Sequence, residues 1–473
     1  MIRQNFNADW TVEKGDGNSR MNSFLGNTQT KTVHLPYDAM IHEARTPDTK
    51  NGAQTGFYPG GEYIFQKHFT APQAWQGKPV FLVFEGVYQT ALVYLNGWLL
   101  TRNVNGYAEF TVEAGPYLKY GADNLLKVIA DNSLEPNSRW YTGSGIYRPV
   151  RLLVGNKVYL PQDTVRITTR EADEGFALLD VTAQVQSAST VTERVTLQQT
   201  ICREGTAVLT DRQNLLLQPG ESRTVSFRYC VDSPALWSPE NPNLYTSTMQ
   251  VLEGEEELDR EETGFGIRTL SIDAAHGVRI NGQTVKLRGA CIHHDNGILG
   301  AATLPDAEER RIRQLKEAGF NAIRSSHHPA GRALLDACDG APVTLHRCID
   351  VSRDLRETYR AAAALGIDTV LTSGGAENCH KGASQLAGLL RLRDELHGPE
   401  VLIGAGVNAA IIDELRAALP GARAFHASCK TLLDSGMTFR REGVPMGLPG
   451  LDEWHIQQTD AETVRAAKDA VMR

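Results

Sequence analysis

Two pairs of histidines follow short apolar runs, in "GACIHHD" and "NAIRSSHHP". His293 and His327 each stand where such a run ends, and in a (β/α) barrel the carboxyl ends of the strands form the active face. A neutral imidazole offers one hydrogen-bond donor and one acceptor, which suits recognition of hydroxyl groups. The two histidines are therefore candidates for binding a hydroxyl-bearing ligand. The alternative is that they are ordinary polar residues of loops that connect strands to helices.

A second set of residues could bind an anion. The stretch "GAGVN" ends one apolar run and opens the helical pattern "AAIIDEL", and "HASCK" ends the next run. Free N–H groups and the helix dipole attract anions at such a helix start. The residues that this pattern predicts for anion binding are Gly404, Gly406, Asn408 and Ser428. The alternative is that the glycines only allow tight turns.

The first half of the chain consists of β patterns. Runs such as "EYIFQKHF" and "ALVYLNGWLL" alternate apolar and polar residues and end in Gly, Asn or Asp. This alternation predicts an antiparallel sandwich over residues 1–155. Similar runs with short turns predict a second sandwich of immunoglobulin-like size over residues 156–272.

The pattern changes to alternating strands and helices after residue 272. In "DAEERRIRQLKEAGF", Ile312, Leu315 and Ala318 share one helical face, and an apolar run follows. Strand and helix patterns then alternate to the end of the chain, through "DTVLTSGG", "ARAFHASC" and "AETVRAAKDAVM". This order predicts a parallel sheet, most simply a TIM-like (β/α) barrel. We divide it into residues 273–339 and 340–473.

Several motifs in the first portion resemble glycoside hydrolase family 2, the β-galactosidase and β-glucuronidase group. They include "FEGVYQTALVYLNG", "NSRWYTGSGIYRPVRL" and "LKEAGFNAIRSSHHP", and the resemblance covers about residues 5–339. It implies a sugar-binding jelly roll, an immunoglobulin-like domain, a catalytic barrel and a carbohydrate partner of the β-galactoside or β-glucuronide type. On this pattern His293 and His327 line the sugar subsite, and Arg139 and Trp140 belong to a jelly-roll loop that covers it.

The two catalytic carboxyl groups of that family are missing from the sequence. A retaining glycosidase needs two carboxyl groups roughly 5 Å apart, one as acid and one as nucleophile. The family pattern supplies glutamates on later barrel strands, the acid in an "NE" pair, and no such pair follows Asp339. We expect surface positions for the later glutamates, including Glu357, Glu377, Glu395, Glu414 and Glu453. No residue is therefore assigned a catalytic role, and we expect the chain to lack hydrolase activity.

The remaining part, from about residue 341, resembles the later half of the CutC family, small (β/α) barrels named for copper homeostasis. The motifs are "PVTLHRCIDVSRD", "LGIDTVLTSGG", "VLIGAGVNAAIIDEL" and "FHASCKTLLDSGMTFR". The resemblance offers copper as a cofactor, and Cu(I) prefers thiolates. However, Cys338, Cys348, Cys379 and Cys429 are also compatible with small buried apolar residues. No metal site is assigned.

The two patterns meet at Asp339 and Gly340 without a linker. Two strand–helix units on one side and four on the other give roughly six strands, fewer than the eight of a closed barrel. We predict an incomplete or composite barrel, whose open edges favour association of copies. Two functions stay open: a carbohydrate-binding protein related to glycosidases, and a CutC-like copper- or anion-binding protein. A recombined gene without an evolved function is the alternative to both.

Charge and composition limit the classes of partner and the cellular compartment that we expect. The net charge of −8 is spread along the chain without a basic block, which argues against nucleic acid. The start of the sequence lacks the apolar core of a signal peptide, and no run has the length of a membrane span. Seven cysteines without close pairs fit free thiols in a reducing compartment. We expect a cytoplasmic protein without a membrane partner.

Overall fold

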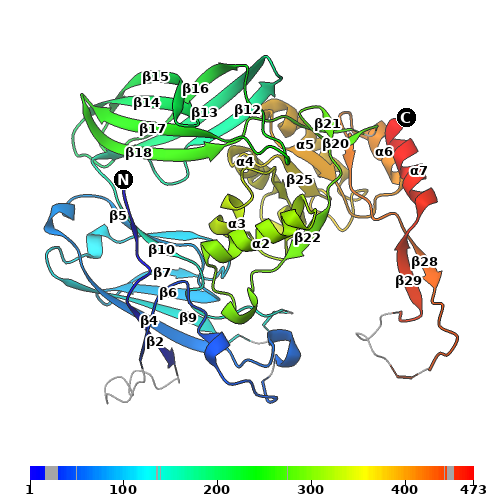
Figure 1. Cartoon of the computed structure of the whole chain (residues 1–473), viewed down its shortest axis with the longest axis horizontal. Helices are drawn as coiled ribbons and strands as arrows, with labels where there is room; N and C mark the ends of the chain where they lie inside the picture. Colours follow the sequence, from blue (N-terminus) through cyan, green and yellow to red (C-terminus); the bar gives the residue numbers. More distant parts are fainter. Residues whose placement is uncertain are drawn as a thin grey trace.

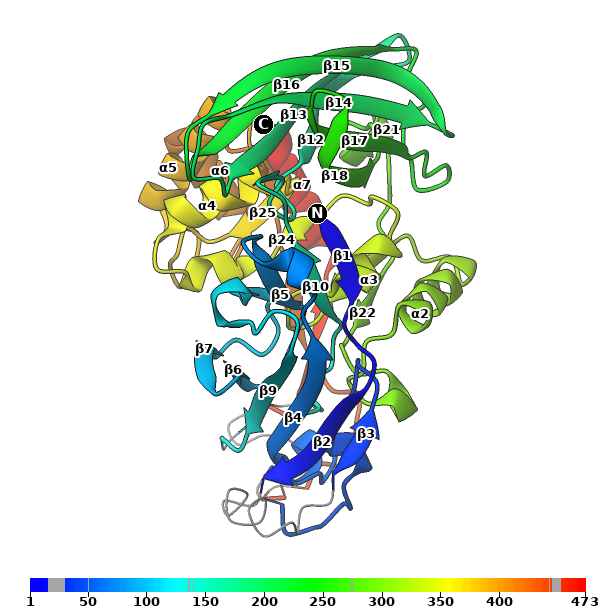
Figure 2. The same cartoon turned by 90° about the vertical axis from the view of Figure 1, so that its left-hand side faces the viewer.

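The computed structural model describes three portions of the chain: a jelly roll, an immunoglobulin-like sandwich and a (β/α) portion (Figure 1). Seen from the side, the two sandwiches lie at opposite ends of the molecule (Figure 2). The described residues are 1–15, 30–49, 51–134, 137–138, 140–273, 275–441, 443–444 and 452–473. Arg139 lies outside them.

The jelly roll consists of two antiparallel sheets. One contains, in order, β1 (Ile2–Asn5), β10 (Val150–Val154), β5 (Val80–Phe84) and β8 (Phe110–Glu113). The other contains β3 (Lys31–Val33), β2 (Trp10–Gly15), β4 (Gly61–Thr70), β9 (Asp123–Asn132), β6 (Thr90–Leu95) and β7 (Trp98–Asn103). Alternate side chains of β9 are buried, as the period of two along a strand requires.

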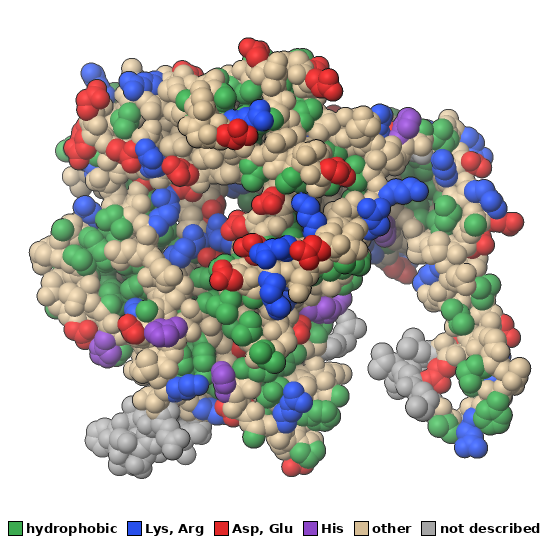
Figure 3. Space-filling view, viewed as in Figure 1, with side chains coloured by type: hydrophobic (Ala, Val, Ile, Leu, Met, Phe, Trp, Pro, Cys, Tyr) green, Lys and Arg blue, Asp and Glu red, His purple; other side chains and the backbone are tan. Residues whose placement is uncertain are grey.

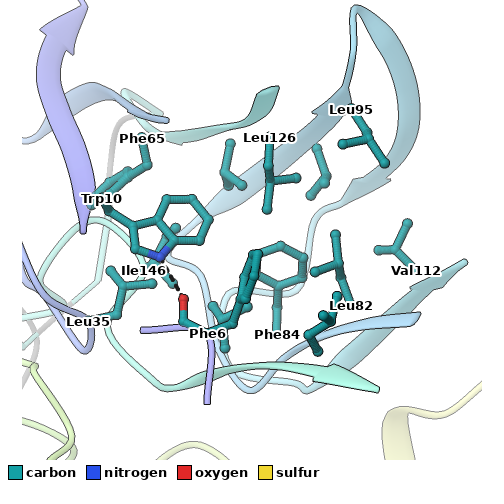
Figure 4. Close-up of a cluster of buried hydrophobic side chains, with 14 of the residues drawn as sticks. Phe6, Trp10, Leu35, Phe65, Leu82, Phe84, Leu95, Val112, Leu126 and Ile146 are labelled. Carbon is teal, nitrogen blue, oxygen red and sulfur yellow. Dashed lines mark hydrogen bonds between the residues drawn. The ribbon is translucent and has the colours of Figure 1, made fainter. Parts of the chain in front are cut away.

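The core of the jelly roll lies between these sheets (Figure 4). Phe65, Leu82 and Leu126 are fully buried there. Trp10 is also fully buried, and its indole Nε1 donates a hydrogen bond to the carbonyl oxygen of Phe6 at 2.8 Å. The buried indole therefore keeps its one donor satisfied.

The second sandwich has its own core. In one sheet β13 (Phe176–Ser187) pairs with β11 (Val158–Tyr159), β12 (Arg166–Ala172) and β16 (Ser222–Asp232). The other contains, in order, β15 (Thr206–Leu217), β14 (Glu193–Arg203), β17 (Tyr245–Glu253) and β18 (Glu256–Phe265). A small sheet of β19 (Leu270–Asp273), β20 (Gly277–Ile280) and β21 (Gln283–Thr284) leads out of it.

The (β/α) portion is an incomplete barrel, which confirms the prediction. β22 (Gly289–Ile292) and β23 (Ala322–Ser325) form a two-stranded parallel sheet that carries α2 (Pro305–Glu317) and α3 (Arg332–Asp336). A separate parallel sheet contains β24 (Thr344–Leu345), β25 (Thr369–Thr372), β26 (Glu400–Ile403) and β27 (Ala424–Phe425). Its helices are α4 (Leu355–Ala364), α5 (Ala383–Leu396) and α6 (Ala409–Ala418). Among the described residues no strand pairing joins the two sheets.

The interruption of the barrel wall coincides with the point where the sequence pattern changes. Asp339 and Gly340 form a turn with φ of 48° and 74°, a conformation that glycine adopts readily. The indole of Trp237, from the immunoglobulin-like domain, donates to the carbonyl oxygen of Asp339 at 2.5 Å. Arg268 pairs with Asp368 at 3.3 Å near this turn. These contacts tie the junction to the second sandwich.

The two parts of the barrel differ in packing. The second sheet has a core that includes Tyr359, Val370 and Val401, all fully buried. On α2, by contrast, Ile312 and Leu315 are only half-buried, and Ala318 just beyond it is exposed. The predicted helical face is present, but the strands that would cover it in a complete barrel are absent from the described chain.

The end of the chain departs from the expected alternation. Between β27 and α7 (Ala461–Met472), β28 (Lys430–Asp434) and β29 (His455–Thr459) form an antiparallel hairpin that the sequence analysis did not predict. It extends away from the rest of the molecule in Figure 1 and exposes Leu432, Leu433 and Ile456.

Acidic and basic side chains are intermingled over the face of the molecule that Figure 3 shows. No described helix has the length and apolar character needed to cross a bilayer.

Candidate functional site

The strand ends of β22 and β23 bring His293 and His327 together. The parallel register pairs Ile292 with Ser325, so the residues that follow these strands emerge side by side. The two imidazole rings are 5.4 Å apart between centroids, at an interplanar angle of 75°. His327 is exposed and His293 half-buried, so a solute can reach both side chains.

Trp140 completes this group from the jelly roll. Its ring lies 4.9 Å from that of His327, tilted by 36°. The structure therefore places three of the four residues predicted to bind sugar within one cluster, which we call the His–Trp cluster (Trp140, His293 and His327). Arg139 precedes Trp140 but falls outside the described residues. Sugar binding by this cluster stays a prediction.

A second histidine pair lies directly behind the first. His294 and His328 are 5% and 8% exposed, and their rings meet edge to face at 4.7 Å. The ring of Tyr107 stacks on His328 at 5.1 Å and 19° and meets His294 edge to face at 5.3 Å. The sequence analysis missed this layer. His294 and His328 directly follow the predicted residues His293 and His327 in the sequence, but only the docking of the jelly roll on the strand ends buries them.

The buried histidines are held as neutral rings. Burial lowers the pKa of His294 to about 4 and that of His328 to about 4, and the nearby cation Arg148 lowers both further. In the neutral form Nε2–H of His294 donates to the carbonyl oxygen of Thr142 at 2.8 Å. Nδ1–H of His328 donates to that of Pro329 at 3.0 Å. The other ring nitrogen of each has no hydrogen-bond partner in the described structure, so an added proton would be a buried, unpaired donor.

A cavity of about 450 Å³ lies beside the His–Trp cluster. Its lining includes Cys291, His293, Asn296 and Arg311. The guanidinium of Arg311 hydrogen-bonds to the backbone. Its Nη1 donates to the carbonyl oxygen of His293 at 2.9 Å and so fixes the loop that carries this histidine. The site is thus an open depression at the edge of β22, lined by both polar and apolar side chains.

Asp295 is the one carboxylate among the described residues that line this opening. The five later glutamates that we expected at the surface are all exposed, in helices α4, α5 and α6 or in loops: Glu357, Glu377, Glu395, Glu414 and Glu453. Asp350, near the end of β25, accepts hydrogen bonds from Arg347, Ser373 and Gly375, among others. Burial alone would raise the pKa of Asp350, but these donors outweigh it and hold the pKa below its usual range.

The residues predicted to bind an anion lie at the other sheet, where β26 and β27 end. The side chain of Asn408 caps α6 by accepting from the N–H of Ile411 at 3.1 Å, so one free N–H is already used. Gly406 has a φ of 77°, and a Cβ on Gly404 would lie 2.7 Å from Leu371 Cδ1. Ser428 is exposed after β27. The backbone conformation therefore favours glycine at 406, whereas a Cβ at 404 would meet the end of the Leu371 side chain. Anion binding stays a prediction.

The described cysteines do not fit a copper centre. Within the described residues no group of three or more His, Cys, Asp or Glu side chains is arranged to hold a metal ion. Burial raises the pKa of Cys338 to about 11 and also raises that of Cys379, so both stay protonated at neutral pH, whereas copper binds the thiolate. We derive no chemistry through copper.

Comparison with known proteins supports both resemblances. Residues 10–176 match the "Glycosyl hydrolase 2 galactose-binding domain-like" family, 158–268 "Glycosyl hydrolases family 2", and 274–350 its "TIM barrel domain". Residues 320–431 match the "CutC family". The β-galactosidase BoGH2A of Bacteroides ovatus is 37% identical over 338 residues, 71% of this chain and 40% of that protein. A β-glucuronidase of Formosa agariphila is 28% identical over 71% of this chain and 37% of its own length.

Solved structures extend the likeness into the second half of the barrel. A glycosyl hydrolase family 2 member from Bacteroides cellulosilyticus superposes with a TM-score of 0.77 at 29% identity, over 89% of this chain and 58% of that chain. A β-glycosidase from Bacteroides vulgatus gives 0.72 at 26% identity, over 85% and 54%. These shares exceed the 71% matched in sequence, so part of the CutC-like segment lies where a family 2 barrel continues. The chain spans about 40% of the length of its curated relatives, and it is a chimera of glycoside hydrolase family 2 and the CutC family.

Proposed function

We propose that this chain binds a β-linked sugar at the His–Trp cluster and does not hydrolyse it. The observation that carries the proposal is the convergence of Trp140, His293 and His327, with ring centroids 4.9 and 5.4 Å apart, at an opening that solute can reach. The imidazoles supply donors and acceptors for sugar hydroxyls, and the indole supplies an apolar surface. The names of the relatives, β-galactosidase and β-glucuronidase, support these two sugars as first ligands.

The absence of hydrolysis is inferred from the carboxylates. Cleavage with retention needs an acid and a nucleophile that both reach the sugar's anomeric centre. Among the described residues that line the opening, Asp295 is the one carboxylate, so the second group is missing there. The five exposed glutamates occupy helices and loops, and the carboxylate of Asp350 already accepts several hydrogen bonds. Without a nucleophile, positioning alone leaves only a small part of an enzyme's rate enhancement.

One experiment tests both parts. The purified full chain is titrated with methyl β-D-galactoside and methyl β-D-glucuronide, with ligand-detected NMR as the readout, and is assayed in parallel with the p-nitrophenyl derivatives. We expect a Kd of roughly millimolar for at least one sugar, weakened at least several-fold in Trp140→Phe, and no p-nitrophenol release above a heat-killed control. Turnover abolished by changing a single glutamate after Asp339 would contradict the proposal, as would binding unaffected by Trp140→Phe.

The open barrel supports a further part of the proposal, association between copies. The outer edges of the separate sheets are unpaired within the described chain, and Leu287, Leu335 and Val351 are exposed in the same portion of the chain. Unpaired edges beside apolar side chains favour association. Light scattering coupled to size exclusion should therefore show a mass above that of one chain, rising with concentration. A single mass of 51.9 kDa at all concentrations would oppose this part.

A further inference from the structure

Tyr107 touches both histidine layers of the site. Its hydroxyl oxygen accepts a hydrogen bond from Nε1 of Trp140 at 3.2 Å, and its ring stacks on His328. The backbone of Tyr107 is fixed as well. Its N–H donates to Oδ1 of Asn105 at 3.1 Å, and its carbonyl oxygen accepts from Nη1 of Arg148 at 2.8 Å. Tyr107 is therefore a rigid support that ends in a hydroxyl directed at Trp140.

The orientation of Trp140 depends on that hydroxyl. An indole has a single donor, its Nε1–H, and Tyr107 accepts it. A hydrogen bond at this edge anchors one side of the indole, whose ring lies 4.9 Å from that of His327. Trp140 is only half-buried, so packing does not enclose it completely. Without the Tyr107 hydroxyl, the indole can turn toward water and lose its position next to His327.

We infer that Tyr107 is a positioning residue that holds Trp140 against His327 and thereby sets the affinity of the site for sugar. The inference rests on the proposed function. Tyr107 itself is not placed in contact with the sugar, and its effect passes through the indole. Pre-organised side chains lose less freedom on binding, so a fixed indole binds more tightly than a mobile one.

The substitution Tyr107→Phe separates positioning from packing. It keeps the ring that stacks on His328 and removes the hydroxyl, which accepts from Trp140 and also forms a hydrogen bond with the side chain of Tyr88. Loss of one such hydrogen bond weakens an interaction roughly 3- to 10-fold. The matched control is Tyr120→Phe, in the same domain, which removes a hydroxyl that donates to the carbonyl oxygen of Gly115 at 2.9 Å and does not contact the cluster.

The experiment compares four full-length proteins: wild type, Trp140→Phe, Tyr107→Phe and Tyr120→Phe. Each is titrated with methyl β-D-galactoside and methyl β-D-glucuronide, and the indole N–H resonance of Trp140, assigned from its loss in Trp140→Phe, is recorded by NMR. We expect Tyr107→Phe to raise Kd roughly 3- to 10-fold and to shift the Trp140 resonance. Tyr120→Phe should change neither.

The possible failures differ from one another. If Trp140→Phe weakens binding but Tyr107→Phe binds as wild type does, the positioning role is overturned and the proposed function stands. An unshifted Trp140 resonance in Tyr107→Phe overturns the role as well. If wild-type protein binds neither sugar, the proposed function fails and this inference fails with it.

Discussion

The imidazole rings of His294 and His328 meet edge to face, 4.7 Å apart, at the contact between the jelly roll and the first barrel strands. The pKa of each is lowered to about 4, against 6.5 for an ordinary histidine. Between these values the unfolded chain binds protons that the folded chain does not. The stability of the fold is therefore complete above about pH 6.5 and falls as the pH drops toward 4.

We expect the two histidines together to lower the free energy of unfolding substantially at acid pH. A shift of one unit corresponds to about 1.4 kcal/mol, so each ring accounts for up to about 3 kcal/mol, reached near pH 4. Thermal unfolding followed between pH 7 and 4 should show the decrease. It should be smaller in His328→Asn, which cannot be protonated, and unchanged in His276→Asn, whose side chain is 54% exposed. Equal pH profiles in all three proteins would refute the assignment.

Arg332 joins three parts of the chain, and its removal should loosen them. From α3 its guanidinium donates to Glu109 of the jelly roll at 2.7 and 2.9 Å, and to Asp163 at 2.9 Å. The side chain is 36% exposed, so we expect Arg332→Met to lower the free energy of unfolding by only about 1–2 kcal/mol.

Urea denaturation measures the effect of Arg332→Met, and high salt should reduce the difference from wild type. Arg313→Met is the control, because Arg313 pairs with Glu309 on an exposed face of α2, and none of its hydrogen bonds or ion pairs in the described structure reaches another domain. An equal loss in both variants would mean that the domain contacts of Arg332 contribute nothing specific.

The two sandwiches should fold without the barrel. Each has its own buried core, and these cores contain no residue after Ile267. A fragment ending near Ile272 is expected to be soluble and to unfold cooperatively on heating. Circular dichroism and calorimetry check this. Aggregation of the fragment, under conditions in which the full chain stays in solution, would count against the division.

Copper should not be retained. A Cu(I) site needs soft ligands that converge, and the described residues contain no group of three or more His, Cys, Asp or Glu side chains arranged to hold a metal ion. Titration against a competing Cu(I) chelator should leave the metal with the chelator. Stoichiometric retention that disappears when Cys348 and Cys379 are both replaced by serine would overturn this expectation.

The sequence determined what local physics can specify. The alternation of β9 gives a strand with one buried face, because successive side chains point to opposite sides. Asn408 ends one strand–helix loop and caps α6 as its residue type favours. The placement of His293 and His327 at neighbouring strand ends also followed from the order of patterns, since parallel strands bring their carboxyl ends to one edge.

The tertiary structure decided which side chains act together. Tyr107, Thr142 and Arg148 lie far along the chain from the histidine layers, and no spacing in the sequence relates them; the bond from Arg148 to Pro329 spans 181 positions. The hairpin of β28 and β29 was equally beyond local pattern. Burial and the pKa of a histidine depend on what packs against it, and that is fixed only when the jelly roll docks on the strand ends.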